Sequence, residues 1–336
     1  MENTFVMAEC VQTFSLRHRM GKAVVALAAI SMATAPMAPV AWADEGGTSF
    51  WLPGQFGSFA ALPSAPGWSL PMMYYHASAN QSANKTTQRG GRITAGLDAK
   101  VDMLFLLPTY VFEKPFLGGQ ASLGVGGALM SMDAGIDATL TGPRGGTLSG
   151  SESDSVTAGS DLYTQGIVKW NKGVHNYMAY TMLGTPIGAY KEERLINPGT
   201  NHWSLDGGGG YTYFDKKNEF SAVLGFTYNF ENDDTDYQNG VDAHLDWGAS
   251  RFISESTHVG LVGYFYQQVS GDSGSGARLG DYKSSVTAIG PQIGHFFAVD
   301  KAKWYVNLKG YYEFDAENRP EGWNLWVSLL IPLGSQ

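Results

Sequence analysis

The sequence is poor in charged residues, in cysteine and in basic runs. Asp, Glu, Lys and Arg make up 16% of its 336 residues, which is below the roughly 25% usual for soluble domains. This shortage of solvated charge argues against a cytosolic enzyme. Because the net charge is −9 and there is no Lys/Arg tract, we exclude nucleic acid as a partner. The single cysteine, Cys10, lies in a segment that we expect to be removed, so neither a disulfide nor a thiolate metal site is predicted.

The N-terminal segment has the layout of a cleaved secretory signal peptide. A basic stretch at 17–22 precedes an apolar run at 23–40 and a small-x-small cleavage site that ends at Ala43. A membrane-spanning helix is the alternative, but two prolines interrupt the second half of the apolar run. We therefore predict that residues 1–43 are a signal peptide.

The rest of the chain contains no stretch of about 18 apolar residues, and apolar and polar residues alternate instead. Every odd position from Ile93 to Phe105 is apolar, while the even positions between them include Asp and Lys. The same alternation recurs at 220–231 and at 241–250. Side chains of a strand point alternately to its two faces, so each segment is predicted to be a strand with one apolar and one polar face.

The alternation predicts twelve strands, most of them long enough to cross a bilayer at a tilt. A membrane-spanning strand needs about 9–11 residues, whereas an ordinary strand has about 5–6. The predicted strands lie near residues 68–80, 92–105, 120–140, 161–170, 176–186, 202–214, 219–230, 241–252, 258–269, 285–297, 304–314 and 323–333.

The connections alternate in length, as they do in bacterial outer-membrane barrels. The long ones are predicted at 81–91, 141–160, 187–201, 231–240, 270–284 and 315–322, and the short ones at 171–175, 215–218, 253–257 and 298–303. The stretch 106–119 breaks this rule, and it is either an extended turn or a misread strand. We predict an all-β fold: a transmembrane, antiparallel, up-and-down β-barrel of about 12 strands over 68–336, in the outer membrane of a Gram-negative bacterium.

In such a barrel the apolar faces meet lipid and the polar faces line the lumen. The predicted lumen-lining residues are Asp98, Lys100, Asp102, Asp242, His244, Asp246, Asn307, Lys309 and Glu313. The N-terminal segment 44–67 is rich in apolar residues and is predicted to be either a plug or a periplasmic tail. The residues that would form the plug are Phe50, Trp51, Leu52, Phe56, Phe59 and Leu62.

Several apparent motifs lack the context that their chemistry requires. The run Gly271–Gly274 resembles the surroundings of a nucleophilic serine, but it lies in a predicted loop with no scaffold for a triad. The glycines at 207–210 are not followed by the Lys-Ser/Thr pair of a phosphate loop. The aspartates at 233–236 are more simply explained as a solvated loop than as a calcium site. We therefore assign no catalytic residue, metal or cofactor.

Four runs resemble the family of outer-membrane proteins named for the meta-pathway of phenol degradation. They are Phe50–Ser58, Tyr264–Gln268, Gly271–Asp281 and Phe314–Trp323, and the resemblance extends over nearly the whole chain after the signal. It implies an outer-membrane barrel that passes hydrophobic or aromatic compounds. The resemblance supplies no motif of catalytic residues.

The sequence therefore predicts a passive uptake channel for small hydrophobic or aromatic compounds, with outer-membrane lipid and the solute as partners. Two alternatives stay open: a barrel enzyme that acts on lipid with His244 as base, and a structural or adhesive barrel in which the long loops do the work. The oligomeric state is not predicted.

Overall fold

The computed structural model describes residues 49–86, 92–141, 146–277 and 283–333. Contacts divide the chain into two units, Met1–Pro39 and Val40–Gln336, and every described residue belongs to the second. The predicted signal peptide lies outside the described residues. No helix among the described residues is long and apolar enough to cross a membrane.

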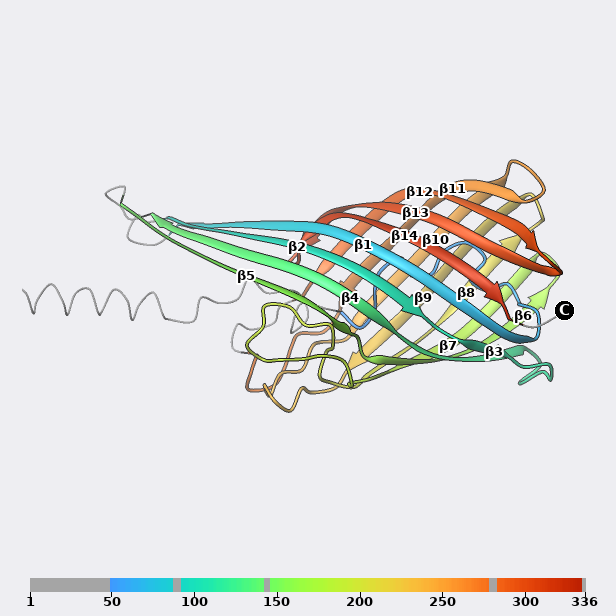
Figure 1. Cartoon of the computed structure of the whole chain (residues 1–336), viewed down its shortest axis with the longest axis horizontal. Coiled ribbons are helices and arrows are strands. Elements are labelled where there is room, and N and C mark those ends of the chain that lie inside the picture. Colours follow the sequence, from blue (N-terminus) through green and yellow to red (C-terminus); the bar gives the residue numbers. More distant parts are fainter. Residues whose placement is uncertain (1–48, 87–91, 142–145, 278–282, 334–336) are drawn as a thin grey trace, which may run out of the picture. The chain divides into compact units, whose positions relative to one another are not determined.

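The described part of the chain forms a closed antiparallel β-barrel of twelve strands, as predicted (Figure 1). The ring closes where β1 pairs with β14, from Ser69 opposite Pro332 to Asn80 opposite Glu321. Its strands are β1 (Gly67–Thr86), β2 (Arg92–Leu106), β4 (Gln120–Thr141), β6 (Leu162–Lys172), β7 (His175–Thr185), β8 (Ser204–Phe214), β9 (Asn218–Asn229), β10 (Asp242–Phe252), β11 (Thr257–Gln268), β12 (Ser285–Val299), β13 (Ala302–Glu317) and β14 (Glu321–Pro332).

Two further strands, β3 (Thr109–Val111) and β5 (Thr147–Gly159), continue strands of the ring. The pairing of β3 with β1 and β4 keeps the register of β2, so β2 and β3 are one strand interrupted at Pro108. A proline cannot donate to the ladder, which explains the break. The stretch 106–119 therefore contains a piece of strand, followed by a turn that is closed by a bridge between Phe116 and Gly119.

Three of the predicted long loops are shorter than expected because the strands beside them are longer. β1 runs on to Thr86 where a loop was predicted at 81–91, and β5 occupies most of the predicted loop at 141–160. β13 and β14 extend to Glu317 and from Glu321, which leaves three residues of the predicted loop at 315–322. The polar residues in these segments led us to predict loops. A strand that continues past the membrane can carry polar side chains on both faces, so polarity alone does not mark the end of a strand.

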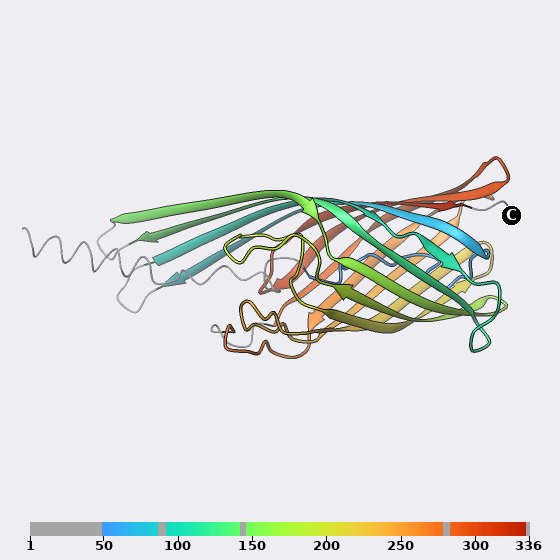
Figure 2. The same ribbon diagram turned by 60° about the horizontal axis from the view of Figure 1, so that its bottom comes forward.

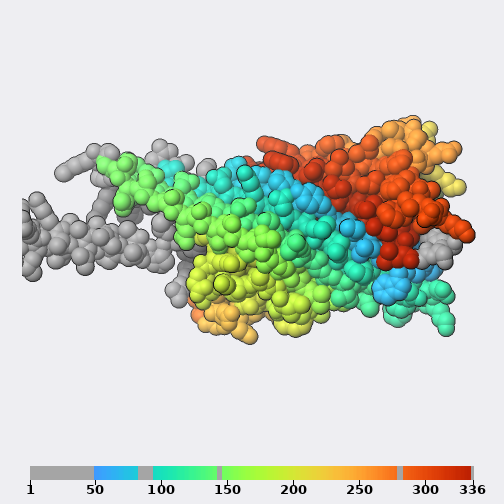
Figure 3. All heavy atoms as spheres, in the orientation of Figure 1, coloured from blue at the N-terminus to red at the C-terminus, as the bar shows by residue number. Residues whose placement is uncertain are grey.

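At the end away from the short turns, β1, β2, β4 and β5 form a four-stranded sheet that projects beyond the rest of the barrel, to the left in Figures 1 and 2; we call it the extension. In the space-filling view it projects as a narrow ridge from the body of the barrel (Figure 3). β5 runs into β6 at Ser160 and Asp161. Three steps along β4, from Gly126 to Leu129, oppose four steps from Gly159 to Tyr163, so one extra residue is accommodated there as a bulge.

The outer face of the barrel carries a belt of exposed apolar side chains. Its members come from strands all around the ring and include Leu104, Leu123, Leu129, Leu205, Leu224, Phe226, Leu261, Phe265, Ile289, Ile293 and Leu308. Exposed aromatic residues also lie near strand ends, among them Trp68, Tyr177, Phe220 and Trp323. This is the surface that a lipid-embedded barrel presents, with aromatic side chains toward the two interfaces.

Candidate functional site

The lumen of the barrel is occupied by residues 49–66, which we call the luminal segment. It lies inside the ring and leads directly into β1 (Figure 1). Trp51 is 1% exposed and Phe50 is 5% exposed. The Phe50 ring stacks on Tyr163 of β6 at a centroid distance of 5.3 Å, against Gly184 of β7. A Cβ at Gly184 would lie 2.5 Å from the Phe50 ring, so glycine makes room for this contact.

Two buried charged side chains, one from β10 and one from β13, hold the backbone of the luminal segment. The Asp246 carboxylate of β10 accepts hydrogen bonds from the Gly54 amide at 2.9 Å and from the Phe56 amide at 3.0 Å. The Lys309 ammonium of β13 donates to the Gly54 carbonyl at 2.5 Å and to the Phe56 carbonyl at 3.3 Å. The same short turn is thus held through both its donors and its acceptors, and hydrogen bonds to charged groups are the stronger kind.

A buried stack lies beside this turn. The Trp51 and His244 rings are parallel within 16° with centroids 3.6 Å apart, and His244 Nε2 lies 2.8 Å from the Asp206 carboxylate. Thr227 also donates to that carboxylate. His244 is 1% exposed and Asp206 is 0% exposed. The histidine is therefore covered on one face by the luminal segment and oriented by Asp206 of β8, which places it in packing rather than at an open surface.

At the end of the barrel with the short turns, the luminal segment contributes Phe59 to an aromatic cluster. The Phe59 ring lies within 5.1–6.1 Å of rings from five strands, namely Phe214, Phe252, His258, Phe296 and Tyr305. The Phe59 amide is bound by Glu219, and the Ala61 amide donates to Thr212. This cluster fills the part of the lumen between β8 and β13 at that end.

At the opposite end, the connection between β7 and β8 folds inward. Ile196 is 0% exposed and packs with Met130, Met132 and Val156. Asp161, at the bulge between β5 and β6, fixes this connection by accepting hydrogen bonds from Gly188 and from both the amide and the hydroxyl of Thr200. The lumen is therefore narrowed at both ends.

The inner wall of the barrel is polar on one side and apolar on the other. The predicted residues Asp242, His244 and Asp246 of β10 and Asn307 and Lys309 of β13 all lie on the inner face and are buried. Glu313 of β13 also faces inward, where it accepts a hydrogen bond from Tyr264. On β2 and β4 the inner face instead carries Met103, Phe105, Met130 and Met132.

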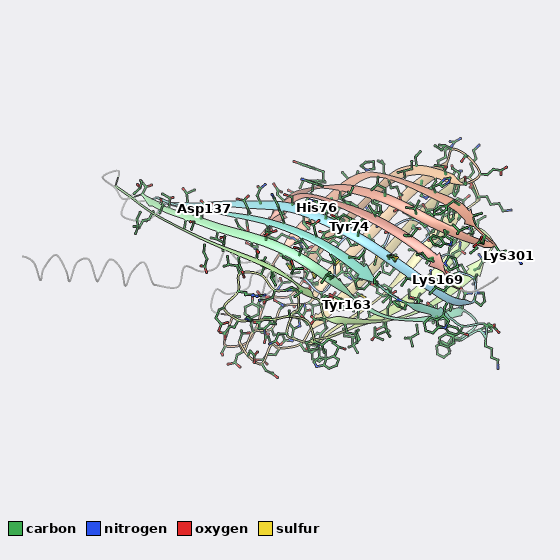
Figure 4. All side chains as sticks on the ribbon, in the orientation of Figure 1. Tyr74, His76, Asp137, Tyr163, Lys169 and Lys301 are labelled. Atoms are coloured by element: carbon green, nitrogen blue, oxygen red, sulfur yellow. The ribbon has the colours of Figure 1, made fainter. Side chains whose placement is uncertain are left out.

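The predicted lumen-lining residues Asp98, Lys100 and Asp102 are placed differently. Asp98 and Lys100 are exposed, whereas their neighbours Leu97 and Ala99 are buried. Asp102 lies on the same outer face, where its carboxylate accepts from Tyr74 and pairs with His76 of β1. Tyr74 and His76 are labelled on β1 in Figure 4, to the right of the extension. These three residues occupy the outer face where β2 rises into the extension, so the expectation that they line the lumen is wrong.

Three inner-wall residues that fix the luminal segment or its partner were not predicted. Glu219 and Lys169 hydrogen-bond to the segment, and Asp206 pairs with His244, which stacks on Trp51. Asp206 precedes the glycine run at 207–210, which hides the alternation of β8 because glycine has no side chain. Glu219 and Lys169 lie near strand ends, where a charged side chain is usually expected to be exposed to water. The sequence did hold an indication of their direction. Glu219 is two residues from the inward-facing Ser221, and Lys169 is six residues from the inward-facing Tyr163, so each pair lies on the same face of its strand.

The described residues contain no group of three or more His, Cys, Asp or Glu side chains arranged to hold a metal ion. The aspartates of the connection between β9 and β10 act in loop structure, because Asp234 accepts from Asn201 and Asp236 accepts from Ser275.

Comparison with known proteins identifies the family. A crystal structure of an outer membrane channel from Pseudomonas putida F1 matches 81% of this chain and 98% of its own, with a TM-score of 0.57 and 16% identity. A FadL homologue from Pseudomonas aeruginosa matches with a TM-score of 0.40, 8% identity and coverage of 80% and 91%. The first likeness shows the barrel fold, and the second is too weak to support an argument.

No curated protein sequence gives a significant match. Residues 83–329 match the family described as "Putative MetA-pathway of phenol degradation". That match spans well over half of the chain, so this protein belongs to the family of the phenol-degradation meta-pathway.

Proposed function

We propose that this protein is an outer-membrane channel for the passive uptake of small hydrophobic or aromatic compounds, with the luminal segment as its plug. The single observation that carries the proposal is the combination of a closed barrel, belted outside by apolar side chains, with a lumen occupied by a separate stretch of chain. A barrel needed only as a rigid scaffold would fill its lumen with its own side chains.

The chemistry of the inner wall supports the substrate class. The wall formed by β2 and β4 offers methionine, phenylalanine and leucine side chains to the lumen, including Met103, Phe105 and Leu107. Methionine is flexible and polarisable and adapts to apolar and aromatic partners of different shapes. A solute that slides along this wall meets few groups that require water.

Liposome swelling tests the proposal. Vesicles that contain the intact protein are compared with vesicles that contain a variant lacking residues 49–66, using an aromatic glucoside and glucose as solutes. We expect faster swelling with the variant, and a preference for the aromatic solute in both forms. Absence of flux in both forms would refute the channel, provided that a heat-modifiability gel shows both barrels folded.

The barrel-enzyme alternative is not favoured by any contact of His244. The ring is fully buried beneath Trp51 and hydrogen-bonded to Asp206, so a lipid reaches it only if the luminal segment moves. Incubation of the purified protein with phospholipid and with lipid A, with His244→Ala as the comparison, tests this alternative directly.

The structural or adhesive alternative gains one specific observation, the extension. Its strand β5 presents mostly exposed Ser, Thr, Gly and acidic residues, and Asp137 of β4 lies on the same sheet (Figure 4). Shortening the extension through paired deletions in β1, β2, β4 and β5 separates the two functions. Unchanged swelling together with lost surface binding would favour adhesion.

A further inference from the structure

A cavity of about 240 Å³ lies between the luminal segment and the wall formed by β1, β2, β3, β4, β6 and β7, with one residue from β14. Its apolar lining includes Phe56, Met73, Phe105, Leu107, Ile167 and Met182. Pockets that take drug-sized ligands measure roughly 300–1,000 Å³, so this cavity suits a compound about the size of one ring. The cavity lies on the apolar side of the lumen.

Among the described residues that line the cavity, Lys169 of β6 is the single charged one. Its position near the end of β6 is labelled in Figure 4. The ammonium donates to the Leu62 carbonyl at 3.0 Å. The ion pairs found among the described side chains are His76 with Asp102 and His244 with Asp206, and neither includes this lysine. An ammonium has three protons to donate, so one carbonyl leaves it with donor capacity to spare.

The second lysine of the lumen provides a contrast. Lys309 donates to two carbonyls of the luminal segment and lies over the rings of Tyr311 and Trp326, at 5.9 Å and 5.2 Å from their centroids. Asp246 holds the same turn from β10. The charge of Lys309 is thus surrounded by partners, whereas the cavity around Lys169 offers only neutral groups.

Neutral polar groups stand beside Lys169 in the lining. Gln165 and Lys169 share the inner face of β6, and Ser122 lies on the adjacent β4. The Gln165 amide donates a hydrogen bond to the Met182 sulfur at 3.8 Å, and sulfur is a weak acceptor. An acid group placed near Lys169 would therefore meet a full positive charge and an amide donor, while its apolar body met the opposite wall.

We propose that this cavity binds small amphipathic carboxylates, aromatic acids of one ring, with Lys169 pairing with the carboxylate and the methionine and phenylalanine side chains holding the ring. The inference rests on the proposed function, because it names a substrate class for the same lumen. Lys169 is partly buried, and a cation that is partly removed from water without a carboxylate partner is costly; a bound acid removes that cost. Selectivity for acids over neutral aromatic compounds follows from the charge.

The test is binding of benzoate and of benzyl alcohol, its neutral counterpart, to the full-length protein in detergent, measured by calorimetry. We expect benzoate to bind more tightly. Lys169→Met should weaken benzoate binding roughly 10- to 100-fold, as expected for the loss of a charged hydrogen bond, and leave benzyl alcohol binding within about twofold. Lys169→Arg should retain most of the benzoate affinity.

Two matched variants separate the effect of the Lys169 charge at the cavity from a change in net charge and from loosening of the luminal segment. Lys172→Met removes an exposed lysine from the same strand, so it changes the net charge equally and should leave benzoate binding unchanged. Thr212→Val removes the acceptor of the Ala61 amide and loosens the same end of the luminal segment without touching the cavity. If Thr212→Val weakens benzoate binding as much as Lys169→Met does, Lys169 acts only by holding the segment, and the inference is wrong.

Equal binding of benzoate and benzyl alcohol by the unaltered protein would also overturn the inference, and this measurement does not require any variant to fold. The assay reads binding rather than flux, so its outcome is independent of the swelling experiment. A protein that binds benzoate through Lys169 but passes no solute would lose the channel proposal and keep this site.

Discussion

The wall of β8–β13 and the wall of β1, β2 and β4 both alternate apolar and polar residues. The first turns polar side chains toward the lumen, and the second turns apolar side chains toward it. In the first, Asp246 and Lys309 face the lumen and apolar residues such as Phe226 face outward. In the second, Met132 faces inward and is 2% exposed, while Asp98 is on the outer face. The strands of the second wall continue into the extension, where their outer face carries exposed polar residues such as Asp98 and Lys100.

This difference shows that alternation separates the two faces of a strand without saying which face turns inward. Within the lipid the outer face must be apolar, as at Leu104 of β2, 42% exposed. Two residues earlier in β2, at Asp102, toward the extension, the outer face becomes polar, while the inner face stays apolar throughout. One wall therefore holds the luminal segment by hydrogen bonds, and the other offers an apolar surface.

The largest effect should come from removing the stack on the polar wall. Trp51→Ala deletes a fully buried indole that packs on His244, and a buried tryptophan contributes about 3–5 kcal/mol when truncated. We expect the luminal segment to leave the lumen for a larger fraction of time, which raises single-channel conductance in a planar bilayer. Trp68→Ala, at a residue 54% exposed, is the control. Equal conductance in all three proteins would show that the stack does not hold the segment.

The next largest effect should come from removing the hydrogen bonds by which the wall of β8–β13 holds the luminal segment. Asp246→Ala orphans the amides of Gly54 and Phe56, and each buried donor without a partner costs about 1–3 kcal/mol. Conductance should rise and the heat-modifiability transition should move to lower temperature. The control, Asp98→Ala, removes an exposed acid from β2 and should change neither measurement. If Asp98→Ala opened the lumen as Asp246→Ala does, the division between the two walls would be wrong.

A smaller effect is expected on the apolar wall. Met132→Gln places an amide among Met103, Met130 and Ile196, at a cost on the order of 1–3 kcal/mol for an unpaired buried amide. Swelling with the aromatic glucoside should slow, while swelling with glucose should change little. Asp133→Asn, one residue along on the exposed face of β4, is the matched control. An equal slowing of swelling with both solutes would indicate general damage to the barrel instead.

The smallest effect lies at a turn of the polar wall, outside the membrane-spanning strands. The pKa of Asp215 falls from its usual 3.8 to about 2 because the carboxylate accepts hydrogen bonds from the backbone and side chain of Asn218 and from the Lys217 amide. A lowered folded pKa stabilises the fold above the unfolded value, and this contribution fades as the pH falls from about 4 toward 2.

Asp215→Asn should therefore lower the midpoint of thermal unfolding slightly at pH 7, and the difference from the unaltered protein should shrink toward pH 2. Asp215 is solvent-exposed, so salt should reduce the effect as well. A difference that grew on acidification would mean that the carboxylate destabilises the turn.

Much of the fold could be predicted from the sequence. The predicted count of twelve strands is confirmed, and the alternation near Asp242, His244 and Asp246 identified residues that the structure places on the inner face. The alternation could not reveal that β2 continues into β3 past Pro108, or that β5 continues β6 through a bulge, because both depend on pairing with β4. Asp206 was missed because the glycines that follow it hide the alternation of β8, and Glu219 was missed because it lies at the start of β9, where a charge is expected to face water.

The sequence by itself determined the two faces of each strand and the closed antiparallel ring, because the period of alternation and the lengths of strands and connections are local properties of the chain. Only the tertiary structure decided which face turns inward, where residues 49–66 lie and which charges meet them. The luminal segment is held by residues more than a hundred positions away, such as Asp246 and Lys309, and contacts over such separations leave no periodic signal in the sequence.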